Sequence, residues 1–298
     1  MRRAIVVLAS AFALVLGGLA QANALKERGD AQAARTSWGK KTLAYGPDKL
    51  QQLDFYPPRT RSGAVPLVIF VHGGGWKRGS KDTAASKYAP EHFTQLGYAY
   101  ASLDYRLVPD ATVEQQASDI ALAVRTLKDR AAELGVDPDR VALMGHSAGA
   151  HLVALVGTDE RYLRQVGLSF ADIRGVIPND GAAYDVATQM DAGAGFMKDT
   201  YIQAFGTDPE RQRALSPTVQ AKAPNAPAFL LIHVQRADGI AQNKGLEAAL
   251  KAAGTRVERQ EFEGRGLRGH AEINRRLGDP DYPATAVVDR WLEMLFRR

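Results

Sequence analysis

The chain contains no cysteine among its 298 residues. This absence excludes disulfide bonds, a thiol nucleophile, thiolate metal sites and lipid attachment through cysteine. It is compatible with export, because a free thiol is a liability in an oxidising compartment. Any nucleophile that this chain uses must therefore be of another residue type.

The chain also lacks the marks of a linker or a tandem array: no Ser/Gly-rich stretch, charge block or internal repeat divides it. With 45% hydrophobic and 24% charged residues, its composition is that of a globular protein with a large core. The formal charge is only +5, and Lys and Arg are spread along the chain without an aromatic and basic patch. These features predict one domain at residues 25–298 and argue against a nucleic-acid partner.

A long hydrophobic run occurs only at the N-terminus. Two arginines precede an apolar stretch at 4–20, and an A-x-A cleavage site follows at 22–24. This is the layout of a secretory signal peptide, although the run is long enough for an uncleaved membrane anchor. A glycine pair at 17–18 favours cleavage. We therefore predict a signal peptide at 1–24 and a periplasmic or secreted chain from Leu25, with a formal charge of about +3 and no membrane association.

Strand-forming and helix-forming segments alternate along the rest of the chain. The run at 65–71, V-P-L-V-I-F-V, has no polar face, as expected of a strand buried on both sides of a parallel sheet. The same reasoning predicts strands in 42–57 (two, about a turn) and at 98–103, 141–144, 173–177, 228–234 and 257–262. Helices are predicted at 87–96, 113–134, 148–156, 242–253 and 284–296. This order indicates a mostly parallel α/β sheet whose ligands lie at the carboxyl ends of the strands.

Two glycine-rich motifs each follow one of these strands. His72-Gly73-Gly74-Gly75-Trp76 is an HGGG-type loop, whose backbone N–H groups can point at a developing oxyanion. Residues 145–149 read G-H-S-A-G, a nucleophile elbow in which Ser147 lies on a strained turn between strand and helix. Its flanking glycines are needed because a Cβ atom there would collide with neighbouring backbone.

A serine nucleophile needs a base within hydrogen-bond reach, and the chain has six histidines. Five of these are expected in other positions: His72 and His146 belong to the motifs, His151 is expected in the core, His92 on a peripheral helix and His233 near a strand end. His270 remains, in a Gly-rich loop at 264–269 between the last strand and the last helix. That is where elbow hydrolases keep the histidine, in the chain order Ser, acid, His.

Two aspartates compete for the role of the acid that orients this histidine. Asp238 follows the strand at 228–234 after a short loop, and chain order favours it. Asp180 also follows a strand, in the turn sequence Asn179-Asp180-Gly181. We predict Asp238 and keep Asp180 as the alternative.

These motifs resemble the α/β-hydrolase superfamily, in its esterase branch near the hormone-sensitive-lipase-like and BD-FAE (feruloyl-esterase-like) enzymes. The resemblance rests on HGGGW at 72–76, D-Y-R-L at 104–107, GHSAGAHL at 145–152 and the late Asp238/His270 pair. It runs from about Tyr45 to the C-terminus. It implies an α/β-hydrolase fold with helices on both faces of a mostly parallel sheet.

The resemblance also implies roles for residues of both motifs. It assigns the N–H groups of Gly74, Gly75 and Ala148 to an oxyanion hole, and Trp76 to the acyl or alcohol pocket. Two features depart from the family: the acid loop at 233–238 has a longer step to the aspartate, and the stretch 182–216 is too short for a large cap and resembles a flexible rim.

The expected activity is that of a secreted serine carboxylesterase acting on small-molecule esters with small or extended acyl groups, through an acyl-enzyme on Ser147. It needs no metal and no organic cofactor. An amide or peptide hydrolase on the same fold is the alternative, and a non-catalytic binding protein is a further one. The natural substrate and the oligomeric state stay open at this stage.

Overall fold

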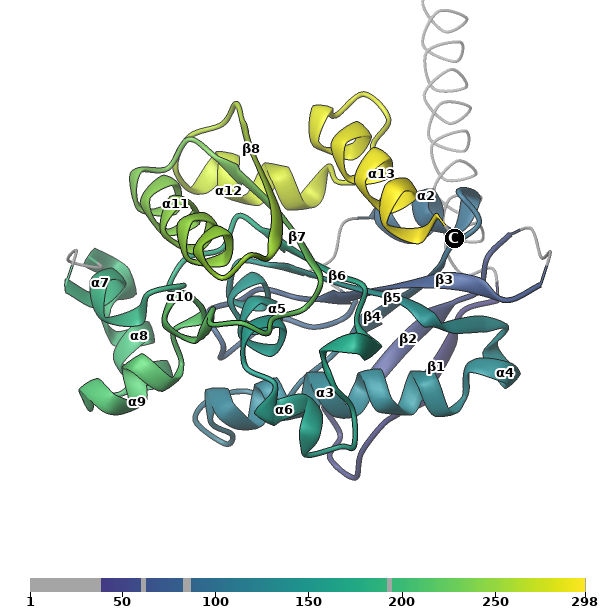
Figure 1. Cartoon of the computed structure of the whole chain (residues 1–298), viewed down its shortest axis with the longest axis horizontal. Coiled ribbons are helices and arrows are strands. Elements are labelled where there is room, and N and C mark those ends of the chain that lie inside the picture. The colour runs from purple at the N-terminus through teal and green to yellow at the C-terminus, as the bar shows by residue number, and fades with distance from the viewer. Residues whose placement is uncertain (1–38, 60–62, 83–86, 192–194, 298) are drawn as a thin grey trace, which may run out of the picture. The chain divides into compact units, whose positions relative to one another are not determined.

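The computed structural model describes residues 39–59, 63–82, 87–191 and 195–297; the predicted signal peptide lies outside them. Its centre is an eight-stranded sheet in the order β1-β2-β4-β3-β5-β6-β7-β8, shown in Figure 1. β1 pairs with β2 and β2 with β4 in antiparallel fashion, and the other neighbours are parallel. The strands are β1 (Lys41–Ala44), β2 (Gln52–Tyr56), β3 (Val65–Val71), β4 (Ala99–Leu103), β5 (Val136–His146), β6 (Gly175–Asn179), β7 (Ala228–Val234) and β8 (Arg256–Phe262).

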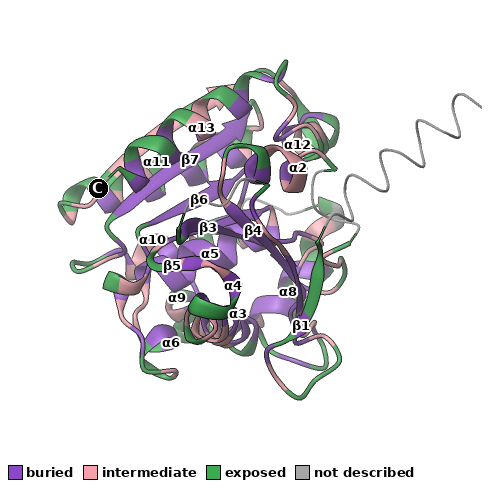
Figure 2. Ribbon diagram, turned by 90° about the vertical axis from the view of Figure 1, so that its right-hand side faces the viewer, coloured by how far each residue is buried: buried purple, intermediate pink, exposed green. Residues whose placement is uncertain are grey.

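The central strands are buried on both faces because their side chains alternate between two hydrophobic layers. In β3, Leu67, Ile69 and Val71 point into one layer, and Val68 and Phe70 point into the other. Figure 2 shows these strands as largely buried, with exposed residues on the outer surfaces of the helices. β8, at the edge, carries charged residues at four of its seven positions, which protects an open edge from pairing with another chain.

Helices cover both faces of the sheet. α3 (Val113–Asp129), α4 (Ala131–Leu134), α5 (Ala148–Thr158) and α11 (Ala237–Ala252) contribute to the layer on the Leu67 side. α2 (Ala89–Gln95), α12 (Gly266–Arg275) and α13 (Pro283–Phe296) contribute to the layer on the Val68 side. In Figure 1, α3 and α13 accordingly lie on opposite sides of β3. The shorter elements on the periphery are α6 (Arg161–Arg164) and η1 (Phe170–Asp172).

The stretch 182–216, predicted to be a rim without a large cap, contains short helices. They are α7 (Val186–Asp191), η2 (Gly195–Met197), α8 (Lys198–Phe205) and α9 (Pro209–Ala214), with α10 (Pro217–Gln220) directly after them. α9 begins with an aspartate followed by a proline. Asp208 caps the helix by accepting a hydrogen bond from the N–H of Glu210. Proline is tolerated at the first helical position because an N–H there would have no partner within the helix. The rim is therefore built of helical turns that stand beside the carboxyl ends of the strands.

Several predicted elements differ from the structure, some of them near the candidate site. The helix predicted at 113–134 is broken at Arg130 into α3 and α4, and Gly135 ends it in the left-handed conformation. β6 ends at Asn179, two residues later than predicted. α11 starts at Ala237, five residues earlier than predicted, and the predicted loop around His270 is helix α12. The last three shifts decide which carboxylate meets the histidine.

Residues Lys41–Arg298 form one compact unit. Among the described residues, no helix combines the length and the apolar character needed to cross a membrane.

Candidate active site

The nucleophile elbow has the strained backbone that its sequence predicts. Ser147 joins β5 to α5 with φ 57° and ψ −118°, a left-handed region that non-glycine residues rarely adopt. Its N–H donates to the carbonyl oxygen of Asn179 on β6 at 3.1 Å. A Cβ atom on Gly145 would lie 2.3 Å from the carbonyl oxygen of Gly149, and one on Gly149 would lie 2.2 Å from that of Val71. The two glycines thus allow α5 to approach the backbone of β3.

The structure brings Ser147 and His270 together. Nε2 of His270 lies 3.0 Å from Oγ of Ser147, within hydrogen-bond reach. Nδ1 of the same ring lies 2.5 Å from Oδ2 of Asp180. The three side chains, which are supplied by the ends of β5 and β6 and by α12, form one hydrogen-bonded series.

The prediction that Asp238 orients His270 is therefore wrong, and the alternative, Asp180, makes the contact. Asp180 directly follows β6 with φ 45°, and its N–H donates to the carbonyl oxygen of Ile232 at 2.7 Å. Its Oδ1 accepts from the N–H of Val234, and its Oδ2 from Nε of Arg236, each at 3.1 Å. Burial raises the pKa of Asp180, but the hydrogen bond from His270 and the charge of Arg236 outweigh it and the pKa is lowered.

Asp238 lies elsewhere because α11 begins one residue before it. Helix formation from Ala237 places Asp238 in the first turn, where a carboxylate is favoured by the helix dipole. Within the described residues, its Oδ2 accepts from Nη1 of Arg236 at 3.2 Å and Nε2 of Gln189 at 3.5 Å. Chain order led to the wrong aspartate, although both aspartates lie between Ser147 and His270 in the chain; the available signal for Asp180 was that it follows its strand more directly than Asp238 does.

His146, the variable residue of the elbow, holds the base in place. Its Nε2 donates to the backbone carbonyl oxygen of His270 at 2.9 Å, and the two rings lie 4.5 Å apart between centroids. Burial lowers the pKa of His146 to about 3, so the ring is neutral at pH 7 and Nε2 carries its single proton. From the sequence, His146 was expected to be a supporting residue of the elbow and not the base, but its contact with His270 was not predicted.

The HGGGW loop is held in an unusual backbone conformation. Gly74, Gly75 and Trp76 all have positive φ, at 122°, 62° and 62°. Two donors fix the end of the loop, since the carbonyl oxygen of Trp76 accepts from the N–H of Val108 at 3.0 Å and from Nε2 of Gln116 at 2.7 Å. The arrangement presents glycine backbone beside Ser147 in the same pocket.

The third predicted oxyanion donor, Ala148, is the first residue of α5. The first N–H groups of a helix have no acceptor within the helix, so this one is free to point at an anion. Gly74, Gly75 and Ala148 all line the pocket that Ser147 enters. The predicted oxyanion hole would therefore lie in the wall of this pocket.

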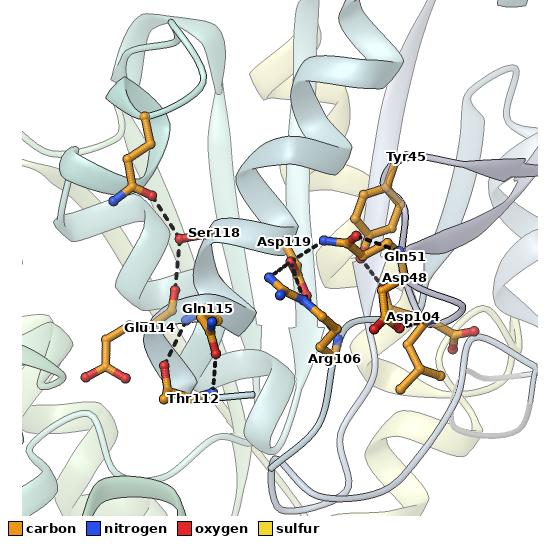
Figure 3. Close-up of polar contacts among 12 residues, drawn as sticks. Tyr45, Asp48, Gln51, Asp104, Arg106, Thr112, Glu114, Gln115, Ser118 and Asp119 are labelled. Atoms are coloured by element: carbon orange, nitrogen blue, oxygen red, sulfur yellow. Dashed lines mark hydrogen bonds and ion pairs between the residues drawn. The ribbon is translucent and has the colours of Figure 1, made fainter. Parts of the chain in front are cut away.

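The D-Y-R-L motif at 104–107 contacts the HGGGW loop at its first residue. The Tyr105 hydroxyl donates to the carbonyl oxygen of His72 at 2.9 Å, and the two rings stack at 4.3 Å. Arg106 donates to the buried carboxylate of Asp119 on α3 through Nε and Nη2, and Gln51 donates to the same carboxylate. Figure 3 shows Arg106, Asp119 and Gln51 converging from three segments of the chain. A bidentate pair of this kind fixes the segment after β4 against α3.

Trp76 lines the pocket, and the buried His151 packs against it. The indole is 3% exposed, and its Nε1 donates to Nδ1 of His151 at 3.3 Å. Nε2 of His151 in turn donates to the carbonyl oxygen of Leu215 at 2.8 Å, and burial lowers the pKa of His151 to about 4. His151 is thus a buried, fully bonded core residue, as predicted. Phe205 packs edge-on against Trp76 with ring centroids 4.7 Å apart.

These elements surround a cavity of about 1010 Å³ at the carboxyl ends of the strands. The triad, the glycine loop and residues of the helical rim all line it. Apolar groups alternate with a few polar ones: besides the residues already described, its walls include Arg78, Ala182, Gln189, Met197, Tyr201, Gln235, Leu267, Ala271, Asn274 and Arg275. A pocket with this lining suits a small molecule held at a reactive serine.

Comparison with known families agrees with the site. The family model described as BD-FAE matches residues 53–246, which include both motifs and both aspartates. The chain belongs to the BD-FAE family. The resemblance of the motifs to the esterase branch of the α/β-hydrolases is thereby confirmed, and the same match covers the D-Y-R-L segment that supports the loop.

Curated relatives of this BD-FAE chain include plant and mycobacterial proteins. It is 25% identical over 240 residues to the isoprenylcysteine alpha-carbonyl methylesterase ICME of Arabidopsis thaliana, covering 76% of this chain and 56% of that protein. It is 37% identical over 102 residues to the carboxylesterase NlhH of Mycobacterium tuberculosis, covering 34% of this chain and 31% of that one. The match to a probable Arabidopsis methylesterase, ICMEL1, covers only 24% of that protein. The chain thus spans from about a quarter to just over half the length of these relatives.

Solved structures confirm the predicted α/β-hydrolase fold. Esterase B from Lactobacillus rhamnosis superposes with a TM-score of 0.71 at 24% identity, covering 93% of this chain and 94% of that one. A truncated carbohydrate esterase from gut microbiota gives the same TM-score at 18% identity, covering 86% and 96%.

Proposed function

We propose that this chain is a serine carboxylesterase that hydrolyses small or extended carboxylic esters through an acyl-enzyme on Ser147. The observation that carries the proposal is the hydrogen-bonded series Ser147, His270 and Asp180, which opens into the pocket beside the glycine loop. Relatives named carboxylesterase and methylesterase support the ester as the bond that is cleaved.

The geometry supports a two-step reaction. Oγ of Ser147 attacks the ester carbonyl carbon while Nε2 of His270 takes its proton. The bond to the alcohol then breaks, and the imidazolium returns the proton to the leaving oxygen. Water repeats the sequence on the acyl-enzyme and releases the acid. Throughout, Asp180 accepts the hydrogen bond from Nδ1, keeps the ring in the correct tautomer and stabilises its charged form.

The negative charge on the carbonyl oxygen is assigned to the N–H groups of Gly74, Gly75 and Ala148. Each such donor contributes on the order of 3–4 kcal/mol to the transition state in serine hydrolases. Trp76 walls the same pocket and is assigned to contact with the acyl or alcohol group. The short helices of the rim enclose the pocket without a large cap, which favours small or extended acyl groups over long-chain triglycerides.

A panel of p-nitrophenyl esters graded in acyl length, with a matched p-nitroanilide, tests the proposal. We expect ester turnover by the wild type, none by Ser147→Ala, and labelling of Ser147 by a fluorophosphonate. Ser118→Ala, which changes a partly buried serine on α3 that does not line the pocket, is the matched control and keeps full activity. Faster cleavage of the anilide would favour an amidase, and labelling at another serine would overturn the assignment.

We also propose that the chain is exported and cleaved near Leu25. The basic start, the apolar run and the A-x-A site at 22–24 support this location. Intact mass of the protein recovered from the periplasm or medium tests it, and a retained Met1 would contradict it.

A further inference from the structure

The guanidinium group of Arg236 lies between the carboxylates of Asp180 and Asp238, next to the candidate triad. Nε of Arg236 donates to Oδ2 of Asp180 at 3.1 Å, and Nη2 donates to the backbone carbonyl oxygen of the same residue at 3.4 Å. Nη1 donates to Oδ2 of Asp238 at 3.2 Å. The side chain of Arg236 is 13% exposed and that of Asp180 is fully buried. Arg236 is therefore a fixed part of the wall and not a solvated surface cation.

The oxygen of Asp180 that binds Arg236 is the one that binds His270. Oδ2 accepts from both Nε of Arg236 and Nδ1 of His270, while Oδ1 accepts from the backbone N–H of Val234. Three donors from two segments thus hold both carboxylate oxygens. Because a carboxylate can rotate about its terminal torsion, this set of bonds selects the plane in which Oδ2 meets the imidazole.

Several charged and titratable groups lie around this pair. They are His146 at the end of β5, His233 in β7, Arg236 and Asp238 at the start of α11, Arg275 on α12, Arg78 after the glycine loop, and the hydroxyls of Tyr184, Tyr201 and Tyr282. Burial lowers the pKa of His146 and His233 and raises that of the three tyrosines, so these five are neutral at pH 7. Of the charged groups named here, Arg236 contacts Asp180 directly, and Asp238 contacts Arg236.

We propose that Arg236 is a positioning residue that sets the orientation and charge balance of the Asp180–His270 pair, with Asp238 as its counter-ion. The inference rests on the proposed function. Arg236 keeps the buried Asp180 carboxylate ionised and aimed at Nδ1, and its positive charge opposes protonation of His270. Asp238, the aspartate expected from chain order to orient the histidine, instead anchors the guanidinium and offsets part of its charge.

The proposal predicts opposite changes for the two partners in the pH profile. Arg236→Gln removes the cation, so His270 becomes easier to protonate and the acid-side midpoint of kcat/KM moves up by about one pH unit, the lower end of shifts caused by a neighbouring charge. Asp238→Asn leaves Arg236 unopposed, so the same midpoint moves down. Arg236→Lys keeps the charge and holds the midpoint near that of the wild type.

The rate responds separately from the pH profile. Arg236→Gln lowers kcat with little change in KM, by about 10- to 100-fold, the range found for groups that orient metal-ligating side chains. Arg236→Lys recovers part of this loss. Arg259→Gln is the matched control because it also removes an arginine–carboxylate pair, with Glu247 at 2.6 Å, from a neighbouring strand without contacting Asp180 or His270. It leaves both kcat and the midpoint unchanged.

A measurement that does not depend on ester turnover distinguishes a failure of this proposal from a failure of the proposed function. The proton between Nδ1 of His270 and Asp180 gives a far-downfield proton NMR resonance, whose position and pH dependence change in Arg236→Gln and in Asp238→Asn but not in Arg259→Gln. Absence of ester turnover with an altered resonance would overturn the function and keep the positioning role. Equal midpoints in all variants, or a resonance unchanged by loss of Arg236, would overturn the positioning role itself, and thermal unfolding of each variant identifies any that fail to fold.

Discussion

Nδ1 of His270 lies 2.5 Å from Oδ2 of Asp180, although the two residues are 90 positions apart and belong to a strand end and a helix. The contact moves the candidate acid from the segment after β7, where we predicted it from the sequence, to the end of β6. These two strands are neighbours in the sheet, so their carboxyl ends open onto the same pocket. Asp180 can therefore take the place of an acid after β7 without moving Ser147 or His270.

Separate substitution of the two aspartates tests whether Asp180 or Asp238 is the acid that orients His270. Asp180→Asn leaves the serine, base and glycine loop in place but favours the wrong tautomer of His270, a change that costs on the order of 10⁴ in kcat in the serine-protease template. Asp238→Asn keeps most of the activity, because Arg236 stays bound to Asp180. Both values come from ester hydrolysis at pH 8, with circular dichroism as the check on folding. If Asp238→Asn is the variant that loses activity, the contact with Asp180 is not the functional one.

The close approach at the elbow makes Gly149→Ala strongly destabilising. The new Cβ atom would lie 2.2 Å from the carbonyl oxygen of Val71 and 2.5 Å from that of His72, both of which are backbone atoms in the sheet or the glycine loop. We expect loss of several kcal/mol in the free energy of unfolding, as for other overpacked core sites. Gly245→Ala is the control. Its Cβ atom would meet nothing within 4 Å on exposed α11, so a gain of about 0.5–1 kcal/mol is expected in urea unfolding.

The hydrogen bond from Gln116 to the carbonyl oxygen of Trp76 should matter for rate more than for binding. Gln116→Leu removes one of the two donors that hold the end of the glycine loop. If the loop supplies the oxyanion hole, kcat falls by up to about 100-fold, the lower end of losses seen when a hole donor is removed outright, and KM changes little. Gln95→Ala is the matched control, because it also removes a glutamine, from the exposed face of α2. We expect this variant to leave kcat unchanged. An equal rise in KM would indicate damage to the substrate wall instead.

Three buried neutral histidines make the fold sensitive to acid. Burial lowers the pKa of His72 and His151 to about 4 and that of His146 to about 3, against about 6.5 in an unfolded chain. The unfolded state therefore binds more protons below pH 6.5, and stability falls as the pH drops from 6.5 toward 4, by on the order of 3 kcal/mol for each histidine.

Urea unfolding between pH 7 and pH 4.5 measures this dependence. His151→Gln removes one of the three titrating groups, so its free energy of unfolding declines less steeply with falling pH than that of the wild type. His92→Gln is the control, because His92 is partly exposed and paired with Asp289. Identical slopes for the wild type and His151→Gln would contradict a neutral buried His151.

Much of the fold and half of the site were predictable because they depend on local pattern. The run at 65–71 has no polar face and so can only be a strand covered on both sides, and β3 has these bounds. The elbow glycines and the HGGG loop are tied to backbone conformations that other residues do not tolerate, so both motifs could be located in the sequence, and the family resemblance then assigned roles to Gly74 and Gly75. His270 followed by elimination, although the chain around it is helical rather than a loop.

The acid, by contrast, was decided by tertiary structure. Asn179-Asp180-Gly181 and Ala237-Asp238-Gly239 are both turn-forming sequences after buried strands, and propensity does not separate them. Two structural facts do: β6 extends to Asn179, and α11 begins at Ala237 so that Asp238 turns toward Arg236. Local sequence determines which residues can form a strand, a strained turn or a helix start, but the partner of His270 depends on where the ends of two adjacent strands lie in space.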